Sequence, residues 1–378
     1  MIVEVLGIFE RNKGAVLMLE AVRAELKKSF PNAELAVPTW MSREARDQFG
    51  VLGVIPPNNG IRTLVYNLLP SFILRRRGLV KASQVDVVLD ASGFSYGDYW
   101  GTEKLRHRLL ERLKGWKSKK NVAVLLPQAL GAFEKDGIAK VFGDSLKYLD
   151  RVFVRDNVSA KYVAGISADS KIKRSPDFTN VLKADLPAEF AATKGAALLI
   201  PNEKMATGDR AHQRDAYVAF MIQSAKALQK SGRNVSILLH EGKRDRVIAD
   251  AINDELATKL PIVNASSALD TKAIIANADL IVSSRFHGLV SALSNGVPSL
   301  ACGWSHKYQE LMDDYGNGQL LVDVEKPETW SEKLNALLEV ADSPAARAGI
   351  RTRADAQRKL TDAMWQDVRE LIKSKRFS

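Results

Sequence analysis

Cysteine is almost absent from this sequence, since Cys302 is the only one among 378 residues. A single cysteine excludes an internal disulfide and any zinc site built on several cysteines, which agrees with a reducing compartment. Histidine is also scarce, with five residues, and no two of them lie four positions apart as paired zinc ligands on a helix do. We therefore expect no metal site.

Long apolar runs are missing as well. No segment approaches the roughly 18 apolar residues that a membrane-spanning helix needs, and the start, MIVEVLGIFERNKG, lacks the basic region and cleavage site of a signal peptide. The hydrophobic fraction of 46% and the charged fraction of 26% are typical of a globular protein. We expect a globular protein located in the cytoplasm.

Basic residues outnumber acidic ones, and the net charge is +11. Residues 103–120 hold eight Lys or Arg against two Glu, and Arg75, Arg76 and Arg77 directly follow the apolar stretch LVYNLLPSFIL. Two interpretations of that second segment stay open: a peripheral contact with an anionic membrane surface on its inner face, or a core helix with a solvated end. No zinc-finger, RNA-recognition or basic-zipper motif is present, so nucleic acid is not an expected partner.

Short apolar runs alternate with longer amphipathic segments along the chain. In the first half, the predicted helix KGAVLMLEAVRAELKKSF follows the first predicted strand. The predicted strands of this half are IVEVLGIF, AELAVP, VDVVLDASG, NVAVLLPQ and RVFVRD. Alternation of this kind predicts a parallel sheet covered by helices on both faces.

The alternation stops at residues 181–195, which resemble a linker, and then starts again. The second series of predicted strands is AALLIP, NVSILLH, PIVNAS, ADLIVSS and PSLACGW, with helices between them. From about residue 329 the sequence predicts helices only. We therefore predict an α/β protein with two Rossmann-like doubly wound domains that face a cleft, 1–187 and 188–328, and C-terminal helices, 329–378, that pack across both.

The stretch SSRFHGLVSALSNGVPSLA, residues 283–301, combines a strand end with an Arg-x-His turn and a helix start. A helix N-terminus favours an anion, Arg285 offers a planar pair of donors for phosphate or carboxylate, and His287 can transfer a proton near neutral pH. Gly288 lets the backbone approach a ligand closely. Taken singly, Arg285 could pair with a nearby acid and His287 could be an interior histidine. Their position after a strand favours a functional pair.

This region, continued through CGWSHKYQELMDDYG, resembles the signature of the polysaccharide pyruvyl transferase family, an Arg-x-His turn followed by a small-residue helix and Gly-x-Pro. Further segments agree with the family in their order along the chain. They are Asn12 to Ala15, DASGFSYGDYWG, PQALGAF, VRDNVSAKYV and SPDFTNVL. The resemblance covers roughly residues 5–320 and is specific only through the joint order of these short motifs.

The resemblance implies a fold like that of the two-domain GT-B glycosyltransferases. It also implies transfer of the pyruvyl group of phosphoenolpyruvate to two hydroxyls of a sugar, in a cell-surface polysaccharide or its lipid-linked precursor, which forms a cyclic ketal and releases phosphate. Phosphoenolpyruvate is then a co-substrate and no cofactor is required. The family's donor-binding arginines correspond to Arg285 with His287 and to Arg155 with Asp156, although the latter pair could be an ordinary ion pair at a strand end.

We hypothesise that His287 acts as the general acid or holds the leaving phosphate, and that Arg285 and Arg155 stabilise the charge that develops on that phosphate. Gly288 completes the donor site. Lys307, in WSHKYQEL, corresponds to a basic position of the family and is either a third cation for the donor or a solvated lysine. Trp304 stands where family members often have Tyr.

The acceptor is expected on the N-terminal domain, in loops that follow strands. Asn12 and Gly14 begin a helix, and their arrangement is equally typical of a plain helix cap. The loop DASGFSYGDYW combines aromatic rings, hydroxyls and carboxylates, as a sugar site requires, and Asp98 could activate the sugar hydroxyl. The candidate acceptor residues are Asn12, Gly14, Ser92, Gly93, Asp98 and Gln128.

Two other classes of function remain. A GT-B glycosyltransferase with a nucleotide-sugar donor is the main alternative, although the turn has Arg-x-His where an acid for ribose hydroxyls would be expected. A noncatalytic binding subunit that has kept the fold is the second, and the presence of Arg155, Arg285 and His287 argues against it. A dehydrogenase is disfavoured because no Gly-x-Gly-x-x-Gly follows the first strand.

Overall fold

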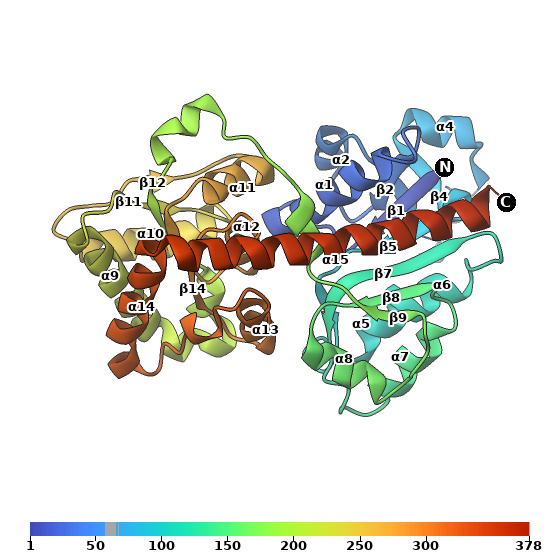
Figure 1. Cartoon of the computed structure of the whole chain (residues 1–378). Helices are drawn as coiled ribbons and strands as arrows, with labels where there is room; N and C mark the ends of the chain where they lie inside the picture. Colours follow the sequence, from blue (N-terminus) through green and yellow to red (C-terminus); the bar gives the residue numbers. More distant parts are fainter. Residues whose placement is uncertain (57–65, 67, 378) are drawn as a thin grey trace. The chain divides into compact units, whose positions relative to one another are not determined.

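The computed structural model describes residues 1–56, 66 and 68–377, and it divides into two compact units (Figure 1). Unit 1 comprises Met1–Phe178 together with Leu360–Ser378, and unit 2 comprises Thr179–Lys359. The first unit ends at Phe178, whereas the sequence predicts the boundary at residue 187, within the linker 181–195. Each unit has its own hydrophobic core.

Unit 1 is built on a parallel sheet with the strand order β4-β3-β2-β1-β5-β7-β8-β9, and β6 pairs with β7. Its described strands are β1 Ile2–Leu6, β2 Glu34–Pro38, β3 Leu52–Ile55, β4 Leu79–Lys81, β5 Val87–Asp90, β6 Phe94–Tyr96, β7 Val122–Leu130, β8 Arg151–Val154 and β9 Ile172–Arg174. Every residue of β1, β5 and β7 is buried, as expected for parallel strands covered on both faces.

The described helices of unit 1 follow these strands in the chain. They are α1 Lys13–Lys27, α2 Arg43–Phe49, α4 Ser71–Arg76, α5 Thr102–Leu105, a π-helical segment Arg106–Glu111, α6 Arg112–Lys114, α7 Ile138–Leu146 and α8 Asn157–Ala164, with a 3-10 turn at Ala82–Gln84. The helix predicted at residues 13–30 is present as α1, and it begins at the cap residue Asn12.

Unit 2 has a six-stranded parallel sheet with the order β12-β11-β10-β13-β14-β15. Its strands are β10 Ala197–Ile200, β11 Val235–Leu238, β12 Ile262–Val263, β13 Leu280–Ser283, β14 Ser299–Cys302 and β15 Leu321–Val322. Its helices are α9 Arg214–Lys230, α10 Lys243–Asp254, α11 Ala268–Ala276, α12 Phe286–Leu293, α13 His306–Asp314 and α14 Trp330–Asp342. Short 3-10 helices cover Phe178–Val181, Ala188–Thr193, Glu203–Met205, Gly208–Gln213, Gly318–Leu320 and Pro327–Thr329.

The order of the second sheet fixes where a ligand site belongs. It is the Rossmann order, in which the chain reverses its direction of winding between the first strand, β10, and the fourth, β13. In unit 1 the same reversal lies between β1 and β5. In each unit, the loops at the carboxyl ends of that strand pair therefore line the crevice that a doubly wound sheet uses for binding.

The last helix, α15, covers Pro344–Arg376 and is drawn in red in Figure 1. The unit boundary falls within it, so its residues up to Lys359 belong to unit 2 and those from Leu360 belong to unit 1. In unit 1, Asp367 pairs with Arg151 and Lys173. Of the segment 329–378, α14 and the first half of α15 belong to unit 2, and the second half of α15 belongs to unit 1. Within the part of the chain that the structure describes, no helix has the length and apolar character needed to cross a membrane.

Candidate functional site

The Arg-x-His turn lies at the carboxyl end of β13, at the point where the second sheet reverses its winding. Arg285 is the cap residue of α12, with φ −102° and ψ 117°, and its backbone N–H donates to Ser283 Oγ at 3.1 Å. Gly288 is required to be small, because a β-carbon there would lie 3.0 Å from Ser283 Oγ and 3.3 Å from the β-carbon of Arg285. The local sequence therefore folds the turn tightly against the strand end.

Ser284 connects this turn to two neighbouring elements. Its carbonyl oxygen accepts from the side-chain amide of Asn202 at 2.9 Å and from the hydroxyl of Tyr308 at 3.1 Å. Its hydroxyl lies 2.5 Å from that of Tyr217, which also accepts from the backbone N–H of Asn202 at 2.9 Å. All four residues are buried, so this network holds the turn in one position.

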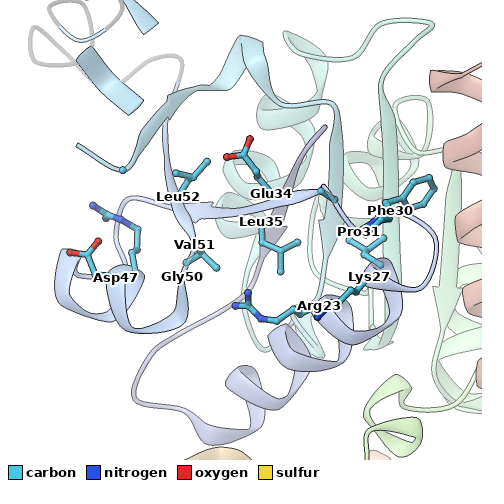
Figure 2. A pocket seen from close by; sticks show the side chains of 14 residues that line it. Arg23, Lys27, Phe30, Pro31, Glu34, Leu35, Asp47, Gly50, Val51 and Leu52 are labelled. Atoms are coloured by element: carbon cyan, nitrogen blue, oxygen red, sulfur yellow. The ribbon is translucent and has the colours of Figure 1, made fainter. Parts of the chain in front are cut away.

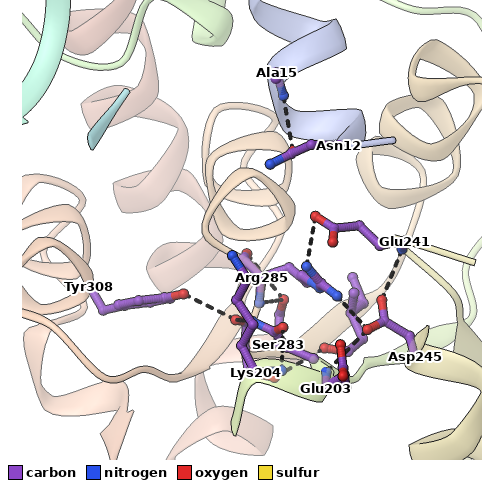
Figure 3. Close-up of polar contacts among 12 residues, drawn as sticks. Asn12, Ala15, Glu203, Lys204, Glu241, Asp245, Ser283, Arg285 and Tyr308 are labelled. Carbon is purple, nitrogen blue, oxygen red and sulfur yellow. Dashed lines mark hydrogen bonds and ion pairs between the residues drawn. The ribbon is translucent and has the colours of Figure 1, made fainter. Parts of the chain in front are cut away.

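Two carboxylates hold the guanidinium of Arg285 (Figure 3). Its Nη1 is 2.8 Å from Glu241 Oε1, and its Nη2 donates to the fully buried Asp245. Asp245 also accepts from the backbone N–H groups of Glu241 at 2.9 Å and Glu203 at 3.2 Å. Burial alone would lower the pKa of Arg285, but the charges of Asp245 and Glu241 raise it above its ordinary value, so the side chain stays charged.

These contacts change the expectation for Arg285. The sequence suggested that both of its terminal nitrogens face a phosphate or carboxylate of the donor, whereas here both contact acids of the protein. Its Nε is buried and has no hydrogen-bond partner among the described residues. In this arrangement Arg285 is a fixed positive charge at the start of α12, and only its Nε remains to donate a hydrogen bond to a ligand. The negative charges of Glu241 and Asp245 weaken the attraction of Arg285 for an anionic ligand.

Further cations and aromatic rings gather beside the turn. The ammonium of Lys307, near the start of α13, lies 5.0 Å from the ring centre of Trp304 and 5.2 Å from that of Phe286. The guanidinium of Arg210 lies 4.5 Å from the ring centre of Trp304. The ring of His287 packs edge-on against Phe286, with 5.6 Å between the ring centres. Unit 2 therefore brings Arg285, His287, Gly288 and Lys307 together, and their role as a donor site stays a prediction.

Arg155 lies in unit 1, directly after β8. Its side chain is buried, with 5% exposed, and Nη1 donates to Asp177 Oδ2 at 3.3 Å. Asp156 caps α8 by accepting from the backbone N–H of Ser159 at 2.7 Å. The backbone N–H of Arg155 donates to Gln128 O at 3.1 Å, and a β-carbon on Gly93 would lie 4.0 Å from its Nη1. The structure thus groups Arg155 with two of the predicted acceptor residues.

The other predicted acceptor residues lie in the loops that follow β1 and β5. Asn12 caps α1 by accepting from the backbone N–H of Ala15 at 3.1 Å, and Gly14 lies in the first turn of that helix. The two loops touch, because a β-carbon on Gly7 would lie only 2.4 Å from Ser92 Cα. Ser92 Oγ accepts from Arg108 Nη2 at 3.1 Å. Asn12 and Ser92 therefore belong to the loops of the two strands between which the first sheet reverses.

Asp98 has a different environment from these residues. Its carboxylate accepts from the backbone N–H of Glu134, at 3.1 and 3.2 Å, and from that of Lys135 at 3.1 Å. These bonds tie the loop after β6 to the loop after β7. Because backbone N–H groups occupy both of its oxygens, these contacts favour an anchoring role for Asp98.

Several residues of these sites could not be predicted from the sequence. Glu241 and Asp245, which hold Arg285, follow β11 and lie in an otherwise ordinary helix start, EGKRDRV. Phe9, Trp40 and Arg108 form an aromatic and cationic group beside Ser92. In the sequence, Phe9 ends the predicted strand IVEVLGIF and Trp40 follows the predicted strand AELAVP, which cannot show that two separate loops meet.

Two surface pockets lie in unit 1, at opposite edges of its sheet. One, of about 580 Å³, is at the carboxyl ends of β1, β2 and β3 and is lined by residues that include Trp40, Arg108 and Arg112. The other, of about 570 Å³ (Figure 2), is lined by the end of α1 and the starts of β2 and β3, including Arg23, Lys27 and Glu34. Only the first lies at the edge where parallel sheets bind ligands. Among the described residues, no group of three or more His, Cys, Asp or Glu could hold a metal ion.

Comparison with solved structures defines the class of the fold. The chain is similar to the UDP-GlcNAc 2-epimerase of Methanocaldococcus jannaschii, solved with UDP-GlcNAc and UDP, at 13% identity and a TM-score of 0.56 over 93% of this chain and 98% of that one. It is similar to HepE of Anabaena, solved with UDP-glucose, at 12% identity and 0.56 over 99% and 100%. It is also similar to the glycotransferase of kitacinnamycin, at 12% identity and a TM-score of 0.51 over 99% of this chain and 98% of that one. The protein thus has a GT-B fold, as predicted.

The family follows from the sequence itself. The profile described as polysaccharide pyruvyl transferase matches residues 12–306, well over half of the chain. The chain therefore belongs to the polysaccharide pyruvyl transferase family, which confirms the resemblance inferred from the motifs, and its class of activity is that of a transferase. No curated protein sequence matches the chain.

Proposed function

We propose that this protein transfers the pyruvyl group of phosphoenolpyruvate to two hydroxyls of a sugar in a cell-surface polysaccharide or its lipid-linked precursor. The observation that carries the proposal is the Arg-x-His turn of a pyruvyl transferase family member, built at the strand end where the second sheet reverses. Lys307 and the start of α12 add positive charge there. Phosphoenolpyruvate has a phosphate and a carboxylate, and such a site favours both.

The reaction balances with the donor and two hydroxyls alone. A proton adds to the methylene carbon and leaves a cation at C2, which the first sugar hydroxyl attacks with loss of its proton. Phosphate then leaves with the electron pair of its bond to C2, and the second hydroxyl attacks C2, closes the ring and gives up its proton to the phosphate. His287 donates the first proton or binds the leaving phosphate, and Arg285 stabilises the developing negative charge. No cofactor or metal takes part in this scheme.

Calorimetric titration with phosphoenolpyruvate tests the donor directly, beside UDP, UDP-glucose and UDP-GlcNAc. We expect wild-type protein to bind phosphoenolpyruvate and not the uridine nucleotides, and Lys307→Gln to bind it more weakly. Arg285→Ala should also weaken binding, with circular dichroism to show that the variant is folded. Arg246→Ala is the matched control, because Arg246 lies in the same unit and forms an exposed pair with Asp250. Failure of the wild-type protein to bind phosphoenolpyruvate would overturn the proposal.

The second candidate function is glycosyl transfer from a nucleotide sugar. It is favoured by the ligands with which the similar structures were solved, UDP-GlcNAc and UDP-glucose. Glu241, beside the Arg-x-His turn, also supplies an acid of the kind that binds ribose hydroxyls, which the sequence analysis had not found. Binding of a uridine nucleotide, with no response to phosphoenolpyruvate, would support this function in place of pyruvyl transfer.

The proposal includes a cytoplasmic location. A lipid-linked acceptor further suggests a peripheral contact with the inner face of the membrane. Of the segment LVYNLLPSFILRRR, residues 64, 65 and 67 lie outside the described residues. In the described part, Leu68 and Phe72 are 79% and 63% exposed. Arg76 and Arg77 are exposed beside them, while Arg75 forms a paired contact with Glu34 at 2.6 and 2.9 Å. Exposed apolar residues next to arginines suit an anionic lipid interface.

Sedimentation with vesicles tests this location. We expect the protein to bind vesicles that contain phosphatidylglycerol and not those of phosphatidylcholine alone, and Phe72→Ser to weaken that binding. Val247→Ser is the control, since Val247 is also exposed, at 54%, but lies on α10 of unit 2. Equal sedimentation with the two kinds of vesicle, or no effect of Phe72→Ser, would contradict the peripheral contact.

A further inference from the structure

Phe9 and Trp40 form an exposed aromatic pair at the carboxyl edge of the first sheet. Phe9 follows β1 and Trp40 follows β2, their ring centres are 6.1 Å apart, and the two rings are inclined by only 14°. Their side chains are 48% and 53% exposed. The indole Nε1 of Trp40 donates to Ile8 O at 3.4 Å, which ties one loop to the other. Two large rings are thus held nearly parallel with apolar surface open to solvent.

Arg108 covers one side of this pair. Its guanidinium carbon lies 5.6 Å from the ring centre of Trp40 and 6.0 Å from that of Phe9, and its Nη2 donates to Ser92 Oγ at 3.1 Å. Its Nε is buried and has no hydrogen-bond partner among the described residues. Arg108 lies on the π-helical segment Arg106–Glu111, a type of irregularity that is frequent at functional sites.

A pocket of about 580 Å³ adjoins this group, and Trp40, Arg108, Thr39 and Arg112 are among the residues that line it. The size is within the range of sites for small ligands, about 300 to 1,000 Å³. The pocket lies at the carboxyl ends of β1, β2 and β3, next to the strand pair between which the first sheet reverses. Position and lining therefore both indicate a binding site.

We infer that Phe9, Trp40 and Arg108 bind the sugar ring of the acceptor. A pyranose has an apolar face of C–H groups, which packs against the electron-rich face of an aromatic ring, and an edge of hydroxyls, which accept hydrogen bonds from a guanidinium. The aromatic pair supplies the first kind of surface and Arg108 the second. Ser92, which accepts from Arg108, belongs to the same subsite. This inference rests on the proposed function, because it assigns the acceptor of that reaction.

The simpler explanation is that these exposed aromatic residues bind no ligand, and the structure argues against it. Isolated exposed aromatic residues are common, but two that are stacked, oriented by a backbone hydrogen bond and set beside a pocket form a continuous apolar patch. Phe377 offers a direct comparison. It is 66% exposed and stacks on Phe30. Phe30 follows the C-terminal end of α1, at the edge of the sheet opposite to the one where ligands bind, whereas Phe9 precedes that helix, at the binding edge.

Saturation-transfer difference NMR tests the inference with methyl pyranosides of glucose, galactose, mannose and N-acetylglucosamine as probes. We expect ring protons of at least one probe to receive saturation from the wild-type protein. Trp40→Ala should weaken its affinity by about tenfold, the loss of one aromatic contact of roughly 1.4 kcal/mol. Trp40→Phe should keep most of the affinity, and Phe377→Ala should bind as the wild type does. Equal signals from wild type and Trp40→Ala, or no signal for any probe, would overturn the inference.

The binding of phosphoenolpyruvate separates this inference from the proposed function. Calorimetry on the same Trp40→Ala sample should give the wild-type affinity for phosphoenolpyruvate, which also shows that the variant is folded. A protein that binds phosphoenolpyruvate but shows no effect of Trp40→Ala on the pyranosides retains the proposed function and loses the acceptor subsite. A protein that binds the pyranosides through Trp40 but ignores phosphoenolpyruvate retains the subsite and loses pyruvyl transfer.

Discussion

Arg285 donates a hydrogen bond to Asp245 although the two residues are forty positions apart in the sequence and on different elements of unit 2. Asp245 is fully buried and also accepts from two backbone N–H groups, one after β10 and one after β11. The carboxylate thus joins the ends of three strands of the second sheet, and the Arg-x-His turn depends on it for its position.

Asp245→Ala should therefore destabilise the protein strongly. Removing one partner of a buried ion pair leaves an uncompensated charge, at a cost of about 3 to 5 kcal/mol in the free energy of unfolding. Urea denaturation followed by circular dichroism measures this. Asp250→Ala removes an exposed partner of Arg246 from the same helix and should cost less than about 0.5 kcal/mol. Equal stability of the two variants would show that Asp245 does not hold the turn.

His287→Asn should reduce turnover and leave donor binding nearly unchanged. Asparagine keeps a similar size but cannot donate a proton near neutral pH, and general acid catalysis contributes at least about 100-fold to a rate. Phosphate release from phosphoenolpyruvate in the presence of sugar acceptors measures kcat, and calorimetry measures the affinity. His212→Asn is the control, because His212 is exposed and lies 3.7 Å from the equally exposed Glu325. Wild-type turnover in His287→Asn would exclude His287 as the acid.

Gly7→Ala should cost more stability than Gly50→Ala. Both glycines have positive φ, +86° and +59°, a backbone conformation that alanine adopts only with strain. A β-carbon on Gly50 meets nothing within 4 Å, and we expect about 1 kcal/mol of strain there. On Gly7 it would lie 2.4 Å from Ser92 Cα, so the two loops must separate, at more than about 3 kcal/mol. Thermal unfolding of the two variants compares these costs, and a smaller loss for Gly7→Ala would contradict the close approach.

Acid should weaken the attachment of the end of α15 through Asp150. Burial alone would raise the pKa of Asp150, but hydrogen bonds from Lys117, from Lys375 and from the backbone N–H of Ala123 hold it below the ordinary value of 3.8. A lowered pKa in the folded state stabilises the protein at pH values above 3.8, and this contribution is lost as the pH falls through the folded-state pKa.

Asp150→Asn removes this contribution, so we expect it to be less stable than the wild type by about 1.5 to 3 kcal/mol near neutral pH. The difference between the two proteins should shrink as the pH falls below 3.8. Urea denaturation at a series of pH values checks the sign. A difference that grows on acidification would mean that Asp150 has a raised pKa.

Periodicity predicted the longest elements well. The strands predicted at residues 2–9, 121–128 and 278–284 are present as β1, β7 and β13. The sequence pattern did not predict β3, β4, β6, β9 and β15. These strands have only two to four residues, and β9, IKR, is largely exposed, so their pairing comes from neighbouring strands and not from their own pattern.

The site shows the same limit of sequence analysis. Arg285, His287, Gly288 and Lys307 could be selected because a strand end, a helix start and charged side chains are local features. Glu241 and Asp245 could not, since an acid early in a helix is ordinary, and only the pairing of β10, β11 and β13 brings these acids to Arg285. Phe9, Trp40 and Arg108 come from three separate segments for the same reason.

The sequence by itself determined the alternation of apolar strands and amphipathic helices, the two Rossmann-like halves, the family, and the identity of the charged turn, because each of these depends on residues close together in the chain. Tertiary structure decided that both terminal nitrogens of Arg285 contact acids, that α15 belongs to both units, and that Phe9, Trp40 and Arg108 meet beside a pocket. These are contacts between distant segments, and their partners depend on strand order, which sets which loops share an edge of the sheet.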